Sequence, residues 1–151
     1  MSFKPVYIVD GSRTPFLKVR NKRGPFSAAD LAVQSARAMM LRQPFAATEL
    51  SEVIVGCAAP SPDETNIGRV VGLRIGTGDK VPAWTVMRNC ASGMQAIDSA
   101  INNIQNGRAD LVLAVGTDAL SRAPLLFKDE MVDWLSTFNG ARSFGQKLTA
   151  L

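Results

Sequence analysis

Short runs of apolar residues alternate along this chain with apolar residues at helical spacing, and this alternation constrains the fold most strongly. The clearest run is Leu111 to Val115, five consecutive apolar residues suited to a strand buried on both faces. Comparable runs occupy Val6 to Val9, Val53 to Val55 and Ala83 to Met87. Strands that alternate with helices form a mostly parallel sheet covered by helices, with right-handed crossovers. The sequence therefore predicts an α/β fold.

Three stretches between these runs have the pattern of helices. Ser27 and Asp30 form a variant of the capping box and open a helix that ends before Pro44. A second apolar stripe covers residues 67–75 and is closed by Gly76 and Gly78. The third stripe lies between Cys90 and Gly107, and its apolar residues are Met94, Ile97, Ile101 and Ile104.

Cys90 lies where the run Ala83 to Met87 gives way to the third helix. A cysteine at such a junction faces the free N–H groups and the positive end of the helix, which stabilise a thiolate. The small residues that follow, Ala91, Ser92 and Gly93, leave the sulfur open to a substrate. Cys90 is therefore a candidate nucleophile for acyl transfer. The alternative is an inert core cysteine, because free cysteine is among the most buried residue types.

Four segments of the chain, taken in order, resemble the N-terminal part of the thiolase family. They are residues 6–16 (VYIVDGSRTPF), 66–69 (NIGR), 81–96 (VPAWTVMRNCASGMQA) and 116–124 (GTDALSRAP). The last departs from the family's Gly-Gly-x-Glu-x-Met-Ser-x-x-Pro pattern at Thr117, Asp118 and Leu120. The resemblance implies a layered thiolase-like half-domain of the α/β class, and it implies that Cys90 carries the acyl group.

This resemblance implies an acyltransferase. Cys90 would take an acyl group from acyl-CoA or 3-ketoacyl-CoA as a thioester, and the group would pass to CoA or condense with acetyl-CoA. CoA and acyl-CoA enter as substrates, and no covalently bound cofactor is expected. Two alternatives remain, a non-catalytic assembly or dimerisation module and a ketoacyl-synthase-like condensing enzyme. The Arg-Thr-Pro-Phe turn at residues 13–16 and the ending at residues 121–124 favour thiolase.

The resemblance also divides the chain. Residues 1–124 are expected to form the N-terminal thiolase α/β half without its last strand, so the sheet would be incomplete, and residues 125–151 to begin the loop domain. The family's catalytic histidine and second cysteine have no counterpart here, so we expect a fragment. A missing strand leaves an unpaired edge, which predicts self-association. The specific hypothesis is a homo-oligomer built on a dimer through the strand Ala83 to Met87.

The tail predicts an amphipathic helix, with apolar residues at i, i+3, i+4 and i+7. These residues are Met131, Trp134, Leu135 and Phe138. An ordinary core-facing helix is the plain interpretation. The tail is most similar to the thiolase subunit of fatty-acid-oxidation complexes, which implies a partner in such a complex.

Composition narrows the remaining classes. The 151 residues are 46% apolar and 20% charged, which fits one globular core. No run approaches the roughly 20 apolar residues of a membrane span, and the N-terminus lacks a signal pattern. We therefore expect a cytoplasmic protein without a membrane role.

The cysteines and the charge exclude further classes. The chain has no histidine and only two cysteines, which are too far apart for a metal or redox motif, so no metal is expected. We expect Cys57, at the end of a strand, to be structural. The net charge of +4 is mild. The basic run between residues 18 and 23 predicts a solvated loop or weak attraction for CoA phosphates rather than nucleic-acid binding, because no aromatic residues interleave it. Its members are Lys18, Arg20, Lys22 and Arg23.

Overall fold

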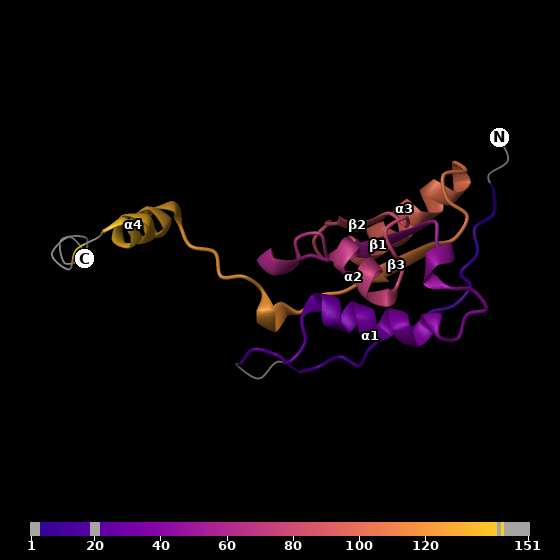
Figure 1. The fold of residues 1–151 in the computed structure, drawn as a ribbon, viewed down its shortest axis with the longest axis horizontal. Helices are drawn as coiled ribbons and strands as arrows, with labels where there is room; N and C mark the ends of the chain where they lie inside the picture. Colours follow the sequence, from indigo (N-terminus) through magenta and orange to yellow (C-terminus); the bar gives the residue numbers. More distant parts are fainter. Residues whose placement is uncertain (1–3, 19–21, 142, 144–151) are drawn as a thin grey trace.

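The structure, a computed structural model, describes residues 4–18, 22–141 and 143. Arg20 of the basic loop and the end of the predicted 125–151 segment lie outside the described residues. Three strands lie side by side between helices, and a fourth helix stands apart at the end of an extended stretch (Figure 1).

The sheet is parallel throughout and has the order β2-β1-β3. Its strands are β1 (Glu52–Gly56), β2 (Ala83–Val86) and β3 (Val112–Gly116). The central strand β1 is buried along its whole length, because it has a neighbour on both sides and helices on both faces. The predicted α/β class and parallel sheet are confirmed.

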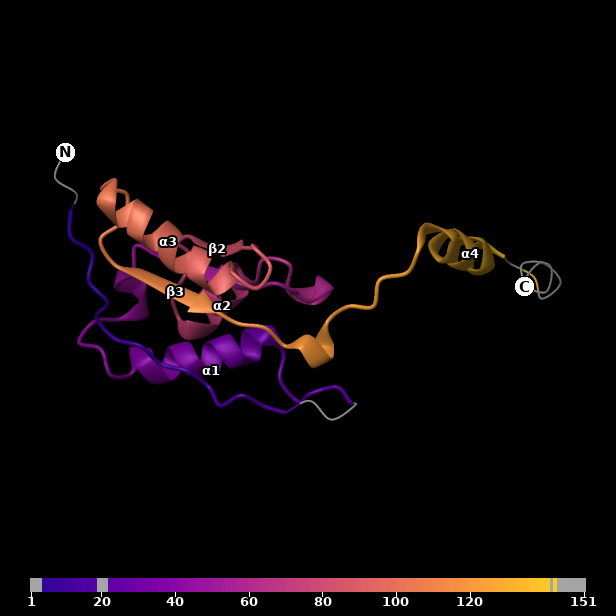
Figure 2. The ribbon, with the colours of Figure 1, turned by 180° about the vertical axis from the view of Figure 1, so that it is seen from behind.

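Helices cover both faces of the sheet. On one face, α1 (Ala28–Met40) and α2 (Ile67–Ile75) pack over Val53, Val55 and Leu113. On the other face, α3 (Ser92–Gln105) packs its Ala96 and Ala100 against Ile54. Successive strand residues point to opposite faces, so β1 contributes to both cores. This three-layer arrangement is visible from both sides (Figures 1 and 2).

Local sequence signals place the helix ends. The hydroxyl of Ser27 accepts from the Asp30 N–H, and the Asp30 carboxylate accepts from the Ser27 N–H, which completes the predicted capping box. Gly76 ends α2 with φ 95°, a left-handed conformation that glycine adopts without a Cβ clash. Gly107, with φ 69°, follows the end of α3 as predicted.

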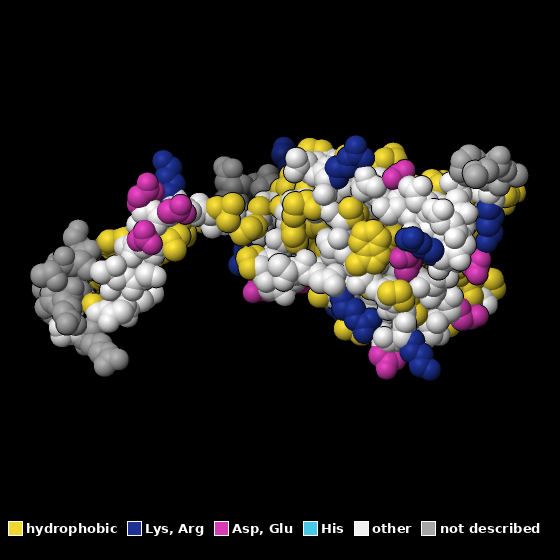
Figure 3. Space-filling view, turned by 90° about the horizontal axis from the view of Figure 1, so that it is seen from above, with side chains coloured by type: hydrophobic (Ala, Val, Ile, Leu, Met, Phe, Trp, Pro, Cys, Tyr) yellow, Lys and Arg dark blue, Asp and Glu magenta, His cyan; other side chains and the backbone are white. Residues whose placement is uncertain are grey.

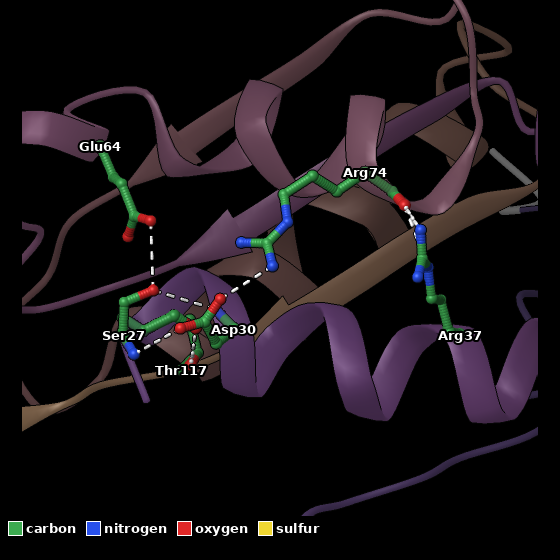
Figure 4. Close-up of polar contacts among 7 residues, drawn as sticks. Ser27, Asp30, Arg37, Glu64, Arg74 and Thr117 are labelled. Carbon is green, nitrogen blue, oxygen red and sulfur yellow. Dashed lines mark hydrogen bonds and ion pairs between the residues drawn. The ribbon is translucent and has the colours of Figure 1, made fainter. Parts of the chain in front are cut away.

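Polar contacts tie α1 to α2 (Figure 4). Arg74 of α2 donates to Asp30 at 2.8 Å, and Arg37 of α1 donates to the carbonyl of Arg74 at 2.6 Å. The hydroxyl of Ser27 also donates to Glu64. The hydrogen bond from the Ser27 backbone, and then that from Arg74, lowers the pKa of the Asp30 carboxyl below its usual value.

The strand predicted at Val6 to Val9 is wrong. This segment is extended but joins no strand of the described sheet, and its side chains are exposed, Ile8 by 89%. It is anchored instead by exposed polar contacts at its two ends, Lys4 to Asp110 at 2.9 Å and Arg42 to Asp10 at 3.0 Å. The physical reason is the absence of a neighbouring strand along its length, since strand formation needs a partner for the backbone groups.

The predicted tail helix is confirmed as α4 (Asp129–Gly140). Its interpretation as an ordinary core-facing helix is wrong, because none of its residues is buried. An extended stretch, residues 123–128, leads α4 away from the sheet (Figures 1 and 2). Apolar side chains are visible on the surface of this stretch (Figure 3), and Leu125 and Leu126 are almost fully exposed.

Three short 3-10 turns complete the described elements. They are η1 (Ala47–Glu49), η2 (Pro62–Glu64) and η3 (Leu120–Arg122). None of the described helices is long and apolar enough to cross a membrane. Among the described residues there is no group of three or more His, Cys, Asp or Glu side chains that could hold a metal ion.

Candidate functional site

Cys90 lies in the tight connection between β2 and α3, two residues before the helix begins. It is a free, exposed cysteine, as the candidate nucleophile must be. The connection follows the carboxyl end of a parallel strand, the edge at which open α/β sheets bind their ligands. The structure therefore places the predicted residue in an accessible position at the appropriate edge of the sheet.

The connection is shaped by Asn89 and Ser92. Asn89 has φ 49°, the one positive φ of a non-glycine residue among those described. The Ser92 hydroxyl accepts from the Arg88 N–H at 2.8 Å and donates to the Asn89 carbonyl at 2.7 Å. Cys90 is thus held inside a closed turn that begins at Arg88 and ends at Ser92.

Glycines at the ends of two strands let the first turn of α3 approach the sheet. A Cβ added to Gly56, the last residue of β1, would lie 2.2 Å from the Ser92 carbonyl oxygen. A Cβ added to Gly116, the last residue of β3, would lie 3.0 Å from the Cα of Gly93. A Cβ at Gly56 would clash with backbone atoms, and one at Gly116 would be tighter than ordinary van der Waals contact. The helix that follows Cys90 therefore rests directly on the backbone of both strands.

Arg88 lies two residues before Cys90, so its sequence position allows two interpretations, a source of positive potential for the cysteine or a member of a surface ion pair. Its guanidinium donates to the Gln95 side chain at 2.7 Å. Gln95 in turn donates to Asp98 at 3.0 Å, so the cation is linked to a carboxylate through a neutral amide. Among the described residues Arg88 therefore forms no direct ion pair, and its guanidinium points to the amide of Gln95 on α3.

An open cavity of about 1480 Å³ begins at Cys90 and runs along the free edge of β3. The walls are β3, the extended N-terminal segment, and the facing sides of α1 and α3. The α3 wall carries Ile97, Ile101 and Ile104, three residues of the predicted apolar stripe. This explains why β3 is only half-buried although full burial was expected, since one edge borders the cavity.

Cys57 lies in the core, fully buried, as expected for a structural cysteine. Its Sγ donates to the Asp118 carboxylate at 3.5 Å, and the same oxygen accepts from the N–H groups of Ala58 and Ala59. Burial, and then the negative charge of Asp118, raises the pKa of the Cys57 thiol to about 12. Cys57 is therefore a protonated thiol near neutral pH and a poor nucleophile.

Sequence reasoning did not identify Gly56, Gly116, Asn89 or the hydrogen bonds of Ser92 as parts of this site. A signal for the glycines was present, because each ends an apolar run that forms a strand. No local signal in the sequence shows that the hydroxyl of Ser92 is buried and hydrogen-bonded, because a small residue beside a cysteine can equally well be exposed.

The arrangement defines a class, a layered α/β protein that presents an exposed cysteine between a parallel strand and a helix. The chain belongs to the thiolase family. Residues 6–143 match the family described as "Thiolase, N-terminal domain".

Curated relatives match the chain along most of its length. A beta-ketoadipyl-CoA thiolase from Pseudomonas knackmussii is 39% identical over 123 residues, which are 80% of this chain and 31% of that protein. A 3-ketoacyl-CoA thiolase from Shewanella halifaxensis is 31% identical over 95% of this chain and 33% of its own length. The human mitochondrial trifunctional enzyme subunit beta is 29% identical over 99% of this chain and 32% of its own length. The chain thus spans about a third of the length of these relatives.

Solved thiolase structures have the same fold. Human mitochondrial 3-ketoacyl-CoA thiolase in complex with CoA matches with a TM-score of 0.66 and 33% identity, over 70% of this chain and 27% of that one. The Acat5 thiolase of Ascaris suum in complex with coenzyme A matches with a TM-score of 0.64 and 26% identity, over 68% of this chain and 27% of that one.

Proposed function

We propose that this chain supplies the acyl-accepting cysteine of a thiolase acyltransferase. The Cys90 thiolate attacks the thioester carbonyl of an acyl-CoA, a carbon–sulfur bond forms, and CoA leaves as its thiolate. With a 3-ketoacyl-CoA the thiolate attacks the 3-keto carbonyl instead, the bond between C2 and C3 breaks, and the acetyl-CoA carbanion that leaves takes up a proton. The reverse half-reaction returns the acyl group to CoA or condenses it with acetyl-CoA. The supporting observation is an exposed, free Cys90 at the β2–α3 connection of a thiolase-family chain.

The chain carries only part of what this chemistry needs. Activation of the thiol and handling of the α-proton each require a base. The family resemblance assigns these tasks to a histidine and a second cysteine, whereas this chain contains no histidine and its other cysteine is buried. We therefore expect these 151 residues alone to be acylated at most, without turnover.

Intact-mass spectrometry after incubation with acetyl-CoA or acetoacetyl-CoA tests this proposal. An acyl adduct on the wild type, absent from Cys90→Ser, would support it. If neither chain gains an adduct, these residues alone do not perform the acylation step.

Alkylation separates this function from the alternative of a non-catalytic assembly module. A nucleophilic Cys90 should react with iodoacetamide much faster than Cys57, whose thiol is buried and protonated. A Cys90 rate no faster than that of a free cysteine in a short peptide would favour the assembly module. A ketoacyl-synthase-like enzyme would instead condense malonyl thioesters.

A homodimer through β2 is the proposed oligomer. The carbonyls of Pro82 and Val86 accept hydrogen bonds from β1 and from the residue that follows it. Because the backbone groups of successive strand residues point to opposite edges, those of Ala83 and Thr85 point to the free edge of β2. A second copy can pair with this edge. Met87→Glu, which places a charge beside the edge, should lower the sedimentation-derived association constant, whereas Leu73→Glu on the outer side of α2 should not. A wild-type chain that sediments as a monomer would refute the dimer.

We also propose that residues 1–124 form an α/β half that takes up one further strand, in the cavity beside β3, and that residues 125–151 begin a second domain. Because the N–H groups of successive strand residues point to opposite edges, those of Val112, Ala114 and Gly116 point into this cavity. The extended N-terminal segment forms the far wall of the cavity. These amides should exchange hydrogen quickly in this chain and slowly in a chain that supplies the strand. Slow exchange here would contradict the proposal.

The compartment and the partner are further parts of the proposal. Both cysteines are free, which fits a reducing compartment, and we propose the cytoplasm. One relative is named a trifunctional enzyme subunit, and we propose a fatty-acid-oxidation complex as a partner, with co-purification as the test.

A further inference from the structure

Ser92 has a buried side chain whose hydrogen bonds do not serve the helix that it begins. Its exposed fraction is 2%, and its hydroxyl bonds backward along the chain, to the N–H of Arg88 and the carbonyl of Asn89. The N-cap of α3 is the neighbouring residue, Ala91, which makes no side-chain capping bond. The hydroxyl is therefore not an ordinary helix cap.

The two hydrogen bonds span Cys90. Arg88 and Asn89 precede the cysteine and Ser92 follows it, so one side chain closes the backbone around the cysteine from both directions. Between them, Asn89 holds φ 49°, a left-handed conformation that is uncommon outside glycine and that asparagine tolerates better than most residues. The Ser92 N–H reinforces the turn by donating to the same Asn89 carbonyl at 3.1 Å.

The far side of the turn is fixed as well. A Cβ added to Gly56 would lie only 2.2 Å from the carbonyl oxygen of Ser92. Ser92 therefore rests against the backbone of β1. Ser92 consequently has a fixed position relative to the sheet, and its hydroxyl transfers that position to the two residues before Cys90.

We infer that Ser92 is a positioning residue, which holds Cys90 in front of the first turn of α3 and in reach of an acyl carbonyl. The consequence for acyl transfer rests on the proposed function, whereas the placement of Cys90 does not. Loss of the hydroxyl leaves the Arg88 N–H without its acceptor and lets Asn89 relax toward negative φ. Cys90 then leaves the positive end of the helix.

The experiment compares Ser92→Ala with Ser92→Thr and with Ser99→Ala, all in a Cys57→Ala chain so that alkylation reports Cys90 alone. Ser99 is a matched control, because its hydroxyl lies on the same helix but takes no part in the turn. The measured quantity is the ratio of alkylation rates by iodoacetate, an anion, and by iodoacetamide, which is neutral. This ratio reports the positive field at the sulfur and not simply its exposure.

Ser92→Ala should lower the ratio several-fold, and it should slow acylation by acetyl-CoA by on the order of tenfold or more, since small displacements of a reacting group have effects of this size. Ser99→Ala should change neither quantity, and Ser92→Thr should restore both. If the added methyl group of threonine prevents folding, Asn89→Gly in the Ser92→Ala chain is the second rescue, because glycine adopts positive φ without strain.

Equal ratios for Ser92→Ala and Ser99→Ala would overturn the inference, as would failure of every folded rescue variant. The proposed function fails separately. If no variant forms an acyl adduct but the alkylation ratio still follows the Ser92 hydroxyl, the positioning role stands and the acyltransferase proposal for this chain falls.

Discussion

Replacing Gly56 by alanine should destabilise the protein by pushing the first turn of α3 off the sheet. The new Cβ would lie 2.2 Å from the Ser92 carbonyl oxygen, 2.3 Å from its carbonyl carbon and 2.7 Å from the Gly93 nitrogen. These neighbours are backbone atoms of a helix, which cannot rotate away. Ordinary contact begins near 3.4 Å, so the helix end must move by about 1 Å.

Two opposing effects set the magnitude. Alanine is favoured over glycine inside a strand by about 0.5–1 kcal/mol, because glycine loses more backbone entropy on folding. Overpacking of a well-packed core costs about 1–3 kcal/mol, and a clash with backbone atoms belongs at the upper end of that range. Overpacking dominates, and we expect a net loss of about 2 kcal/mol, a large part of the 5–15 kcal/mol that typically stabilises a domain.

Urea unfolding followed by far-UV circular dichroism measures this loss. Gly140→Ala is the control, because nothing lies within 4 Å of its added Cβ, and we expect its free energy of unfolding to change by less than about 1 kcal/mol. A Gly56→Ala protein within about 0.5 kcal/mol of the wild type would refute the reasoning, because surface substitutions alone reach that value.

Three further predictions concern titration and buried polar contacts. Folding raises the pKa of Cys57 from 9.0 to about 12, so the contribution of the protonated thiol to stability should be fully present below pH 9 and be lost between pH 9 and 12. In a series of urea unfolding experiments across this range, Cys57→Ala should lose less stability than the wild type. Because folding lowers the pKa of Asp30, its contribution is present above the unfolded value of 3.8 and is lost as the pH falls below it; Asp30→Asn should weaken that acid dependence. Glu52, 8% exposed, accepts from Trp84 at 2.9 Å and from Asn103, so Glu52→Ala should cost about 2–3 kcal/mol by leaving two donors unpaired, whereas a loss under about 0.5 kcal/mol in thermal unfolding would contradict this.

The elements that sequence predicted correctly are those governed by local rules. The capping box at Ser27 and the left-handed glycine that ends α2 act within one helical turn, so their residue types are sufficient evidence. The strands β1 and β3 were also predictable from their continuous apolar runs, because a strand between two helical layers needs no polar face.

The elements that it missed depend on distant partners. Val6 to Val9 has the composition of a strand, but a strand exists only beside another one, and the facing edge of β3 lies across a cavity. The amphipathic pattern of α4 predicted a helix without saying what its apolar face would cover. Likewise, the cysteine was found from its neighbours, whereas the turn that holds it required the φ of Asn89 and the direction of one hydroxyl.

The extended stretch before α4 is a site where a protease can cleave this protein. Leu126 is 90% exposed and Phe127 57%, and both lie in backbone without helix or strand, which a protease active site accepts in extended form. Chymotrypsin at low concentration should therefore cut here, as it should at the exposed Phe16 of the extended N-terminal segment, and the cut here releases α4 and leaves Cys90 with the three-layered body. The cleavage that releases α4 would thus mark on a gel where this protein can be shortened without touching its candidate nucleophile.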